Sequence, residues 1–285
     1  MKPARFRYLR AESVDDALQA LANNPDAQIL AGGQSLIAMM NLRLVKPACL
    51  IDINRISKLG YIREDGDGIA IGALARHNDV KHSPLVRERC PLLTEAYDSI
   101  AHHTVRNRGT LGGNLCHADP SSETPAVMIA IGATLELHCV HGKREVGAED
   151  FFLGTYETAR RQDEMLTEIR IPGRGADGWA FDEISNRHGD FAIAVIATTL
   201  RLAKGRCESA RVVASGVGEH AVRLKSAEEA LIGSEIDDAH LNAAAAAARD
   251  EVDPHSDTHA DAAYRRDAIA ALTRRTVRRA AERCG

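Results

Sequence analysis

The N-terminal part of the chain alternates between helical and extended patterns of apolar positions. Apolar residues recur at helical spacing over 14–21, directly after a Ser-x-x-Asp sequence at Ser13 that resembles a helix-capping box. Two short apolar runs, 27–31 and 48–53, are predicted to be strands, with a short helix over 36–42 between them. This part is therefore predicted to form a small α/β unit.

Extended patterns become more frequent in the middle of the chain. Apolar positions on both sides of the Gly-Asp-Gly turn at 66–68 predict a β-hairpin. These glycines also resemble the start of a dinucleotide fingerprint, but Ile71 stands in place of the third glycine, which excludes that motif. The other patterns predict helices over 78–82, 91–102 and 123–131, and strands over 133–140 and 165–171.

The polar, glycine-rich segment 173–178 is the best candidate for a linker. Beyond it, three extended runs that we expect to pair as antiparallel strands are followed only by helical patterns. The predicted strands are 179–185, 191–202 and 210–217, and the predicted helices are 226–231, 236–249 and 260–284. The whole pattern indicates an α+β protein.

The last predicted helix combines an apolar stripe with many arginines. The stripe comprises Ile269, Leu272, Thr273, Thr276, Val277 and Ala280. The arginines lie mostly off it, at Arg265, Arg266, Arg274, Arg275, Arg278 and Arg279. We interpret this basic surface as a solvated face; a docking surface for a protein partner is the alternative.

Composition narrows the class of protein. The chain has 285 residues and a formal net charge of -4, which gives no reason to expect a nucleic-acid partner. The N-terminus lacks the apolar segment of a signal peptide and no run is long enough to span a membrane, so we expect a cytoplasmic protein.

The six cysteines are Cys49, Cys90, Cys116, Cys139, Cys207 and Cys284. They form no C-x-x-C pair, so we expect reduced thiols rather than a zinc ribbon or an iron–sulfur cluster held by this chain alone.

Two Gly-Gly pairs are the strongest candidates for chemistry. The sequence QILAGGQS contains Gly32 and Gly33, and RGTLGGNLC contains Gly112 and Gly113. Adjacent glycines indicate positive φ or a neighbour too close for a Cβ atom. Free N–H groups in such turns bind anions, so two turns would hold the two phosphates of a dinucleotide from opposite sides. Either pair alone is more typical of an ordinary tight turn.

Five elements of the chain resemble, in order, one known family. They are AGGQSL at 31–36, KPACLIDINRI at 46–56, VRNRGTLGGNLCHADPSSETP at 105–125, RHGDFAIA at 187–194 and DPHSDTHADAAYRR at 253–266. The chain resembles the FAD-binding medium subunit of the molybdenum hydroxylases, of the carbon monoxide dehydrogenase and xanthine dehydrogenase type. The resemblance implies a two-part FAD-binding domain of the vanillyl-alcohol-oxidase type at 1–173, with subdomains of about 1–57 and 58–173. A smaller C-terminal α+β domain at 179–285, a three-stranded antiparallel sheet with helices, would follow.

The resemblance also implies a set of FAD contacts. Ala31, Gly32, Gly33, Gln34 and Ser35 would surround one side of the FAD pyrophosphate, and Thr110, Leu111, Gly112, Gly113 and Asn114 the other. Glu123 stands where relatives use an aspartate to hold an adenosine ribose, and Met165 and Leu166 would line the adenine side. Phe191 would lie beside the isoalloxazine, or else be a buried strand residue. Asp182 and Glu183 replace a lysine that many members have, so a lysine contact to FAD is not expected here.

The implied function is electron transfer. A large subunit would carry molybdenum-pterin, a small subunit [2Fe-2S] clusters, and this chain a non-covalent FAD that passes electrons to NAD⁺, a quinone or dioxygen. The resemblance further implies a dimer of heterotrimers. No residue of this chain is expected to act as a catalytic acid or base, and no metal ligand is expected.

Two alternatives remain open from the sequence. One is a stand-alone flavoprotein oxidase of the same superfamily, in which Cys116 or His117 would tether the flavin. The other is a metal-binding or purely interacting protein that uses Asp253, His255, Asp257 and His259. For that segment, capping of the following helix by Asp257 or Thr258 is the simpler interpretation. We assign no chemistry to His102 and His103, which we expect at the end of a helix.

Overall fold

The N-terminal unit is a three-stranded parallel sheet with two helices. Its elements are β1 (Arg7–Arg10), α1 (Val14–Ala22), β2 (Ala27–Leu30), α2 (Leu36–Asn41) and β3 (Cys49–Asp52), with strand order β1-β3-β2. Ser13 caps α1, because its side chain accepts the N–H of Asp16 at 3.1 Å. The Asp16 carboxylate accepts the N–H of Glu12 instead of that of Ser13, so only half of the predicted capping box forms. The predicted α/β unit is confirmed.

The middle of the chain forms a five-stranded antiparallel sheet covered by short helices. Residues 1–173 and 177–284 are described by this computed structural model. The strands are β4 (Ile62–Asp65), β5 (Gly68–Gly72), β10 (Met165–Ile171), β6 (Thr134–Cys139) and β7 (Gly142–Gly147), in that spatial order. The helices are α3 (His77–His82), α4 (Pro84–Arg89), α5 (Pro91–Ala96), α6 (His103–Arg106), α7 (Leu111–His117), α8 (Glu123–Ile131) and α9 (Ala148–Phe151). A 3₁₀ turn, η1 (Ser57–Leu59), precedes the sheet, and β8 (Phe152–Gly154) pairs with β9 (Glu157–Thr158).

The predicted helix over 91–102 is wrong in its second half. Helix α5 ends at Ala96, and His102 is instead the N-cap residue of α6. Both histidines therefore lie at a helix N-terminus, where the dipole does not favour a positive charge. The sequence interpretation also missed α4, which begins at Pro84 directly after α3 because proline is well suited to the first turn of a helix.

The C-terminal unit is a four-stranded antiparallel sheet with three helices on one face. Its strands are β11 (Gly178–Ser185), β12 (Ala192–Ala203), β13 (Arg206–Ser215) and the short β14 (Val222–Arg223), and its helices are α10 (Lys225–Leu231), α11 (Asp238–Glu251) and α12 (Ala262–Glu282). The three predicted strands are antiparallel as expected, but β14 adds a fourth that was not predicted. The proposed linker lies outside the described residues at 174–176, and Gly178 already belongs to β11.

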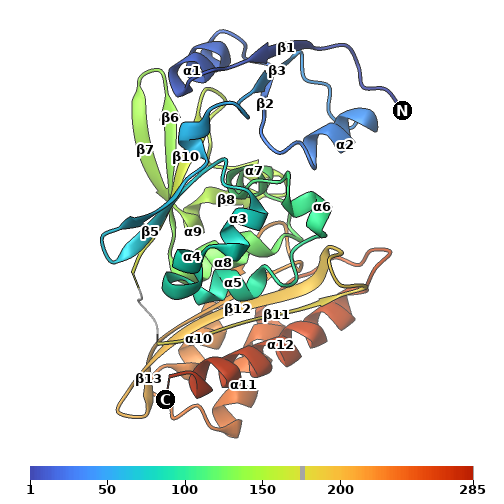
Figure 1. Cartoon of the computed structure of the whole chain (residues 1–285). Helices are drawn as coiled ribbons and strands as arrows, with labels where there is room; N and C mark the ends of the chain where they lie inside the picture. Colours follow the sequence, from blue (N-terminus) through green and yellow to red (C-terminus); the bar gives the residue numbers. More distant parts are fainter. Residues whose placement is uncertain (174–176, 285) are drawn as a thin grey trace.

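Strand β12 is apolar over residues 192–197 because both of its faces are buried there. Val195 and Ala197 face the core of the middle unit, whereas Ala194 and Ile196 face the core formed with α10, α11 and α12. The three units are thus stacked, with the N-terminal unit at one end and the C-terminal helices at the other (Figure 1). No helix among the described residues is long and apolar enough to cross a membrane.

Helix α12 confirms the predicted buried stripe, all six members of which are buried. The prediction for Arg265 is wrong, since this side chain is buried rather than solvated. The other arginines pair with carboxylates of the same chain. Arg266 contacts Asp253, and Arg274 and Arg278 contact Asp238. Arg275 contacts Asp182, and Arg279 lies 3.5 Å from Glu95. These pairs favour the solvated-face interpretation over a docking surface.

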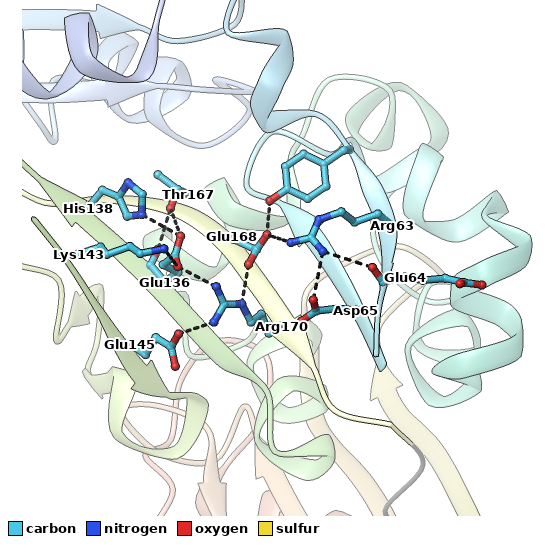
Figure 2. Close-up of polar contacts among 11 residues, drawn as sticks. Arg63, Glu64, Asp65, Glu136, His138, Lys143, Glu145, Thr167, Glu168 and Arg170 are labelled. Carbon is cyan, nitrogen blue, oxygen red and sulfur yellow. Dashed lines mark hydrogen bonds and ion pairs between the residues drawn. The ribbon is translucent and has the colours of Figure 1, made fainter. Parts of the chain in front are cut away.

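The five-stranded sheet carries a network of ion pairs on one face (Figure 2). Arg170 lies at its centre, with Nη2 2.8 Å from Glu136 and Nε 2.6 Å from Glu168. Both carboxylates are buried. Burial alone would raise the pKa of Glu136, but hydrogen bonds from Lys143 and His138 hold it below its ordinary value. The same balance, with hydrogen bonds from Tyr61, Arg170 and Arg63, lowers the pKa of Glu168.

Candidate functional site

The first glycine turn connects β2 to α2 and packs directly on the second glycine segment. A Cβ atom on Gly32 would lie 2.7 Å from the Cα atom of Gly109, which leaves no room for a side chain. Gly33 has a φ of +72°, a conformation that non-glycine residues rarely adopt. Both reasons for a glycine that the sequence suggested, close approach and positive φ, therefore apply to this pair.

The first turn also has unused hydrogen-bond donors. The backbone N–H groups of residues 32–36 donate to no acceptor among the described residues. Main-chain donors without a protein partner are uncommon unless water or a ligand accepts from them. Five consecutive donors at one turn fit an anion with several oxygen atoms, such as a pyrophosphate.

The second glycine segment differs from the prediction, because its backbone donors are already used. Residues 111–117 form helix α7, and its cap Thr110 accepts the N–H of Gly113 through Oγ1 at 3.1 Å. The N–H groups of Leu111 and Gly112 donate to the carbonyl oxygens of Ala75 and Ala73 at 3.0 and 3.1 Å. The expectation of a second row of free amides is therefore wrong. Neither glycine has a positive φ.

Close packing explains the second pair of glycines instead. A Cβ atom on Gly112 would lie 2.6 Å from the Cβ atom of Ala73. One on Gly113 would lie 2.7 Å from Thr110 Oγ1 and 3.7 Å from the Cβ atom of Ala31, in the first turn. Glycine at position 113 thus keeps open the space between the two segments.

Two residues that the sequence interpretation did not single out connect the segments. Asn54 Nδ2 donates to the carbonyl oxygen of Ala31 at 2.7 Å, and Arg76 Nη2 donates to Asn54 Oδ1 at 2.7 Å. Arg76 Nη1 also donates to the carbonyl oxygen of Arg108. Asn54 lies in the family-like sequence KPACLIDINRI, which was a signal for it; Arg76 has no comparable signal.

The start of α8 lies against Asn114. Asn114 Oδ1 accepts hydrogen bonds from the hydroxyl groups of Ser122, at 2.9 Å, and Thr124. Glu123 lies between these two residues and is only 5% exposed. Burial, and next the charge of Glu183, raise the pKa of Glu123 to about 8. This raised pKa favours the protonated carboxyl group near neutral pH in the ligand-free chain, and in that form it can both donate and accept hydrogen bonds.

Glu123 predicts a pH-dependent cost to the stability of the FAD-free chain. The raised pKa means that the folded chain keeps a proton that the unfolded chain releases, so stability falls as pH rises from 4.5 towards about 8. A Glu123→Gln variant removes this cost. We expect its thermal midpoint to exceed that of the wild type by an amount that grows over this pH range, measured by circular dichroism. An offset that is constant with pH would contradict the prediction.

The remaining predicted contacts lie in different environments. Phe191 is 65% exposed just before β12, so the alternative of a buried strand residue is wrong. Met165 and Leu166 are buried in β10, between the cores of the N-terminal and middle units. Where the lysine would stand, Asp182 pairs with Arg275 at 3.0 Å, and Glu183 Oε2 is buried without a partner among the described residues.

The structure disfavours a covalent flavin tether at Cys116 and a metal site at 253–259. Burial raises the pKa of the Cys116 thiol, which disfavours the reactive thiolate. Asp257 is engaged by Arg265 at 2.6 Å and by two backbone N–H groups. The N-cap residue of α12 is Asp261, so neither Asp257 nor Thr258 caps it. No group of three or more potential metal ligands occurs among the residues that the structure describes.

The N-terminal and middle units, followed by an antiparallel sheet with helices, correspond to two known families of flavoprotein domains. Residues 4–174 match the family model described as "FAD binding domain in molybdopterin dehydrogenase", and residues 179–280 match "CO dehydrogenase flavoprotein C-terminal domain". The chain belongs to the FAD-binding subunits of the molybdenum hydroxylase family. The resemblance inferred from the sequence is confirmed, and so are FAD as cofactor and an oxidoreductase role.

Relatives and solved structures agree over almost the whole length. The chain is 39% identical to the 6-hydroxypseudooxynicotine dehydrogenase complex subunit alpha of Paenarthrobacter nicotinovorans, over 99% of this chain and 97% of that protein. It is 39% identical to the carbon monoxide dehydrogenase medium chain of Hydrogenophaga pseudoflava, over 100% of both. A structure of carbon monoxide dehydrogenase from that organism superimposes with a TM-score of 0.97 at 41% identity, covering 100% of both chains. Quinoline 2-oxidoreductase from Pseudomonas putida 86 gives 0.95 at 37% identity, covering 100% of this chain and 99% of that one.

Proposed function

We propose that this chain receives electrons from [2Fe-2S] clusters of a small partner subunit and passes them to an external acceptor. A large partner subunit would carry the molybdenum-pterin and oxidise the substrate. FAD suits this role because it accepts electrons singly and releases them as a pair. The match to this family over both parts of the chain supports the proposal. The observation that supports FAD binding itself is the row of N–H groups at residues 32–36, which have no acceptor within the described part of the chain.

The first glycine turn would hold the FAD pyrophosphate through its main chain. The donors would be the N–H groups of residues 32–36 and the Ser35 hydroxyl group. Glycine at 32 lets the turn pack on Gly109, and glycine at 33 allows its positive φ. On the other side, residues 110–114 would contribute close packing and the Asn114 side chain. Asn114 Oδ1 is occupied by Ser122 and Thr124, which leaves its Nδ2 group as a donor.

Three further contacts complete the proposed site. The protonated Glu123 would hydrogen-bond ribose hydroxyl groups, which both donate and accept. Exposed Phe191 would cover the isoalloxazine, since an aromatic ring stacks well on another flat ring. Buried Met165 and Leu166 would contact the adenine side through main chain and small apolar surface. We propose that residues 1–173 form the FAD-binding domain and residues 179–285 the C-terminal domain. Phe191 would then be a contact from the C-terminal domain.

Substrate choice would belong to the large subunit. Relatives of this chain with 34 to 39% identity include subunits of caffeine, carbon monoxide and glyceraldehyde dehydrogenases. Such different substrates accompany similar flavin chains, so the flavin chain is not where they are distinguished. We propose an assembly of two heterotrimers, with this chain as the medium subunit.

The FAD of the purified protein is expected to leave on acid precipitation. A non-covalent cofactor loses its hydrogen bonds when the chain unfolds, so the yellow colour should appear in the supernatant, where absorbance and chromatography identify FAD. Flavin that stays with the pellet would indicate a covalent tether. A protein without flavin, purified under mild conditions, would contradict the proposal itself. Substrate-dependent dye reduction should require the other subunits.

A further inference from the structure

Arg265 is a buried guanidinium group at the start of α12. It is 5% exposed, and its Nη1 donates to the carbonyl oxygens of Ile193 at 2.5 Å and Gly216 at 2.7 Å. Its Nη2 donates to Asp257 at 2.6 Å. A buried charge is costly unless hydrogen bonds and a counter-charge compensate it. Arg265 is therefore fixed between two main-chain segments and one carboxylate.

The two main-chain segments are adjacent to proposed FAD contacts. Ile193 lies two residues after the exposed Phe191. Gly216 donates its N–H to the carbonyl oxygen of Pro120 at 2.8 Å, and Ser215 Oγ lies 2.7 Å from that oxygen and 2.8 Å from the carbonyl oxygen of Ser122. Ser122 directly precedes Glu123, and Pro120 lies three residues before it. One guanidinium group thus connects the segment of Phe191 with the segment of Glu123.

Close packing at Gly216 brings the Ile193 and Gly216 segments together. Gly216 has a φ of +78°, and a Cβ atom there would lie 2.9 Å from the carbonyl oxygen of Ile193. A side chain would separate the two strands. The glycine lets both carbonyl oxygens approach the same Nη1 atom of Arg265.

Asp257, the carboxylate partner of Arg265, also connects to the turn that carries Phe191. Asp257 Oδ1 accepts the N–H groups of His259 and Ala260 at 2.8 and 3.0 Å. His259 Nδ1 in turn lies 3.1 Å from Asn186 Nδ2, on the other side of that turn. The turn over 186–191 is therefore held at both ends by groups that depend on Arg265 and Asp257.

We propose that Arg265, held by Asp257, is a positioning residue for bound FAD that fixes the Phe191 segment relative to the Glu123 segment. This inference rests on the proposed FAD contacts of those two residues. When the guanidinium is removed, the two segments move independently, and the isoalloxazine and the ribose are no longer held in one geometry. The effect reaches FAD through Phe191 and Glu123, since Arg265 itself contacts only protein.

The test compares Arg265→Met and Asp257→Asn with matched controls in the full chain. The controls are Arg266→Met and Asp253→Asn, because Arg266 pairs with the exposed Asp253 at 2.8 Å one position further along the helix. We expect the Kd for FAD to rise about tenfold in Arg265→Met, because the Phe191 and Glu123 segments are no longer held in one geometry; this ratio corresponds to ~1.4 kcal/mol of binding free energy. The visible circular dichroism of bound FAD should change in both test variants and in neither control. Arg265→Lys should give an intermediate result.

A double variant separates positioning from general stabilisation. In a Phe191→Leu background, Arg265→Met should add little to the change in visible circular dichroism but should still lower the thermal midpoint. Equal Kd and visible spectra in wild type, Arg265→Met and Asp257→Asn would overturn the inference. If Arg265→Met does not fold, the Kd and the visible spectrum of Asp257→Asn test the inference alone. Asp257 is half exposed, so we expect this variant to fold. A wild-type chain that binds no FAD would overturn the proposed function as well.

Discussion

A Gly33→Val variant is expected to lose its FAD while keeping most of its fold. At a φ of +72° a β-branched residue is strained, and the new Cβ atom would lie 3.1 Å from Leu30 and 3.2 Å from Ile37. The turn must shift, and its row of N–H groups shifts with it. We expect the FAD content per chain to fall at least about tenfold, the ratio that corresponds to ~1.4 kcal/mol of binding free energy. Flavin absorbance of the purified chain measures it.

Gly66 offers a matched control for backbone strain. It has a φ of +61° in the β4–β5 hairpin, and nothing lies within 4 Å of a Cβ atom placed there. Gly66→Val should therefore cost a similar amount of stability without loss of FAD. Equal FAD content in the two variants, whether high or low, would contradict a specific role for the first glycine turn.

An Arg170→Met variant is expected to lower the free energy of unfolding by about 2–3 kcal/mol, because charge-assisted hydrogen bonds to two buried carboxylates are lost. The loss is not larger because Lys143 still contacts Glu136 and Arg63 still contacts Glu168. Figure 2 shows Lys143 and Arg63 on opposite sides of Arg170. Urea denaturation measures the change.

The pH dependence and a surface pair check the cause of this effect. Because the pKa values of Glu136 and Glu168 lie below the ordinary value of 4.5, their stabilising contribution is present above that pH and is lost as pH falls below it. The difference in free energy of unfolding between Arg170→Met and the wild type should therefore become smaller as pH falls below 4.5. Arg206→Met breaks an exposed pair with Glu235 and should cost at most about 0.5 kcal/mol. A cost for Arg170 no larger than for Arg206 would show that burial of the network is unimportant.

The sequence predicted elements well where local pattern and burial agree. The strand over 165–171 and the helix over 123–131 have the predicted ends, because the strand ends before Pro172 and Gly132 ends the helix with a φ of +69°. The helix over 91–102 failed because nothing in the local pattern marks where α5 stops, at Ala96.

The site was predictable in its position but not in its hydrogen bonds. The Gly-Gly pairs were visible in the sequence, and the structure does bring them together. The acceptors for the amides of 111 and 112, however, are carbonyl oxygens of Ala73 and Ala75, in a distant part of the sequence. Arg265 was misjudged for the same reason, since its partners Ile193 and Gly216 also lie far from it in the sequence. Periodicity reports which face is apolar, but it does not report which long side chain finds acceptors inside.

The most direct test of the account is a crystal structure of the protein with FAD bound. The account predicts that pyrophosphate oxygen atoms lie within hydrogen-bond distance of the N–H groups of residues 32–36. Gly113, which packs near Ala31, should lie on the other side of the same phosphates. A pyrophosphate bound elsewhere, with those N–H groups still facing solvent, would contradict it.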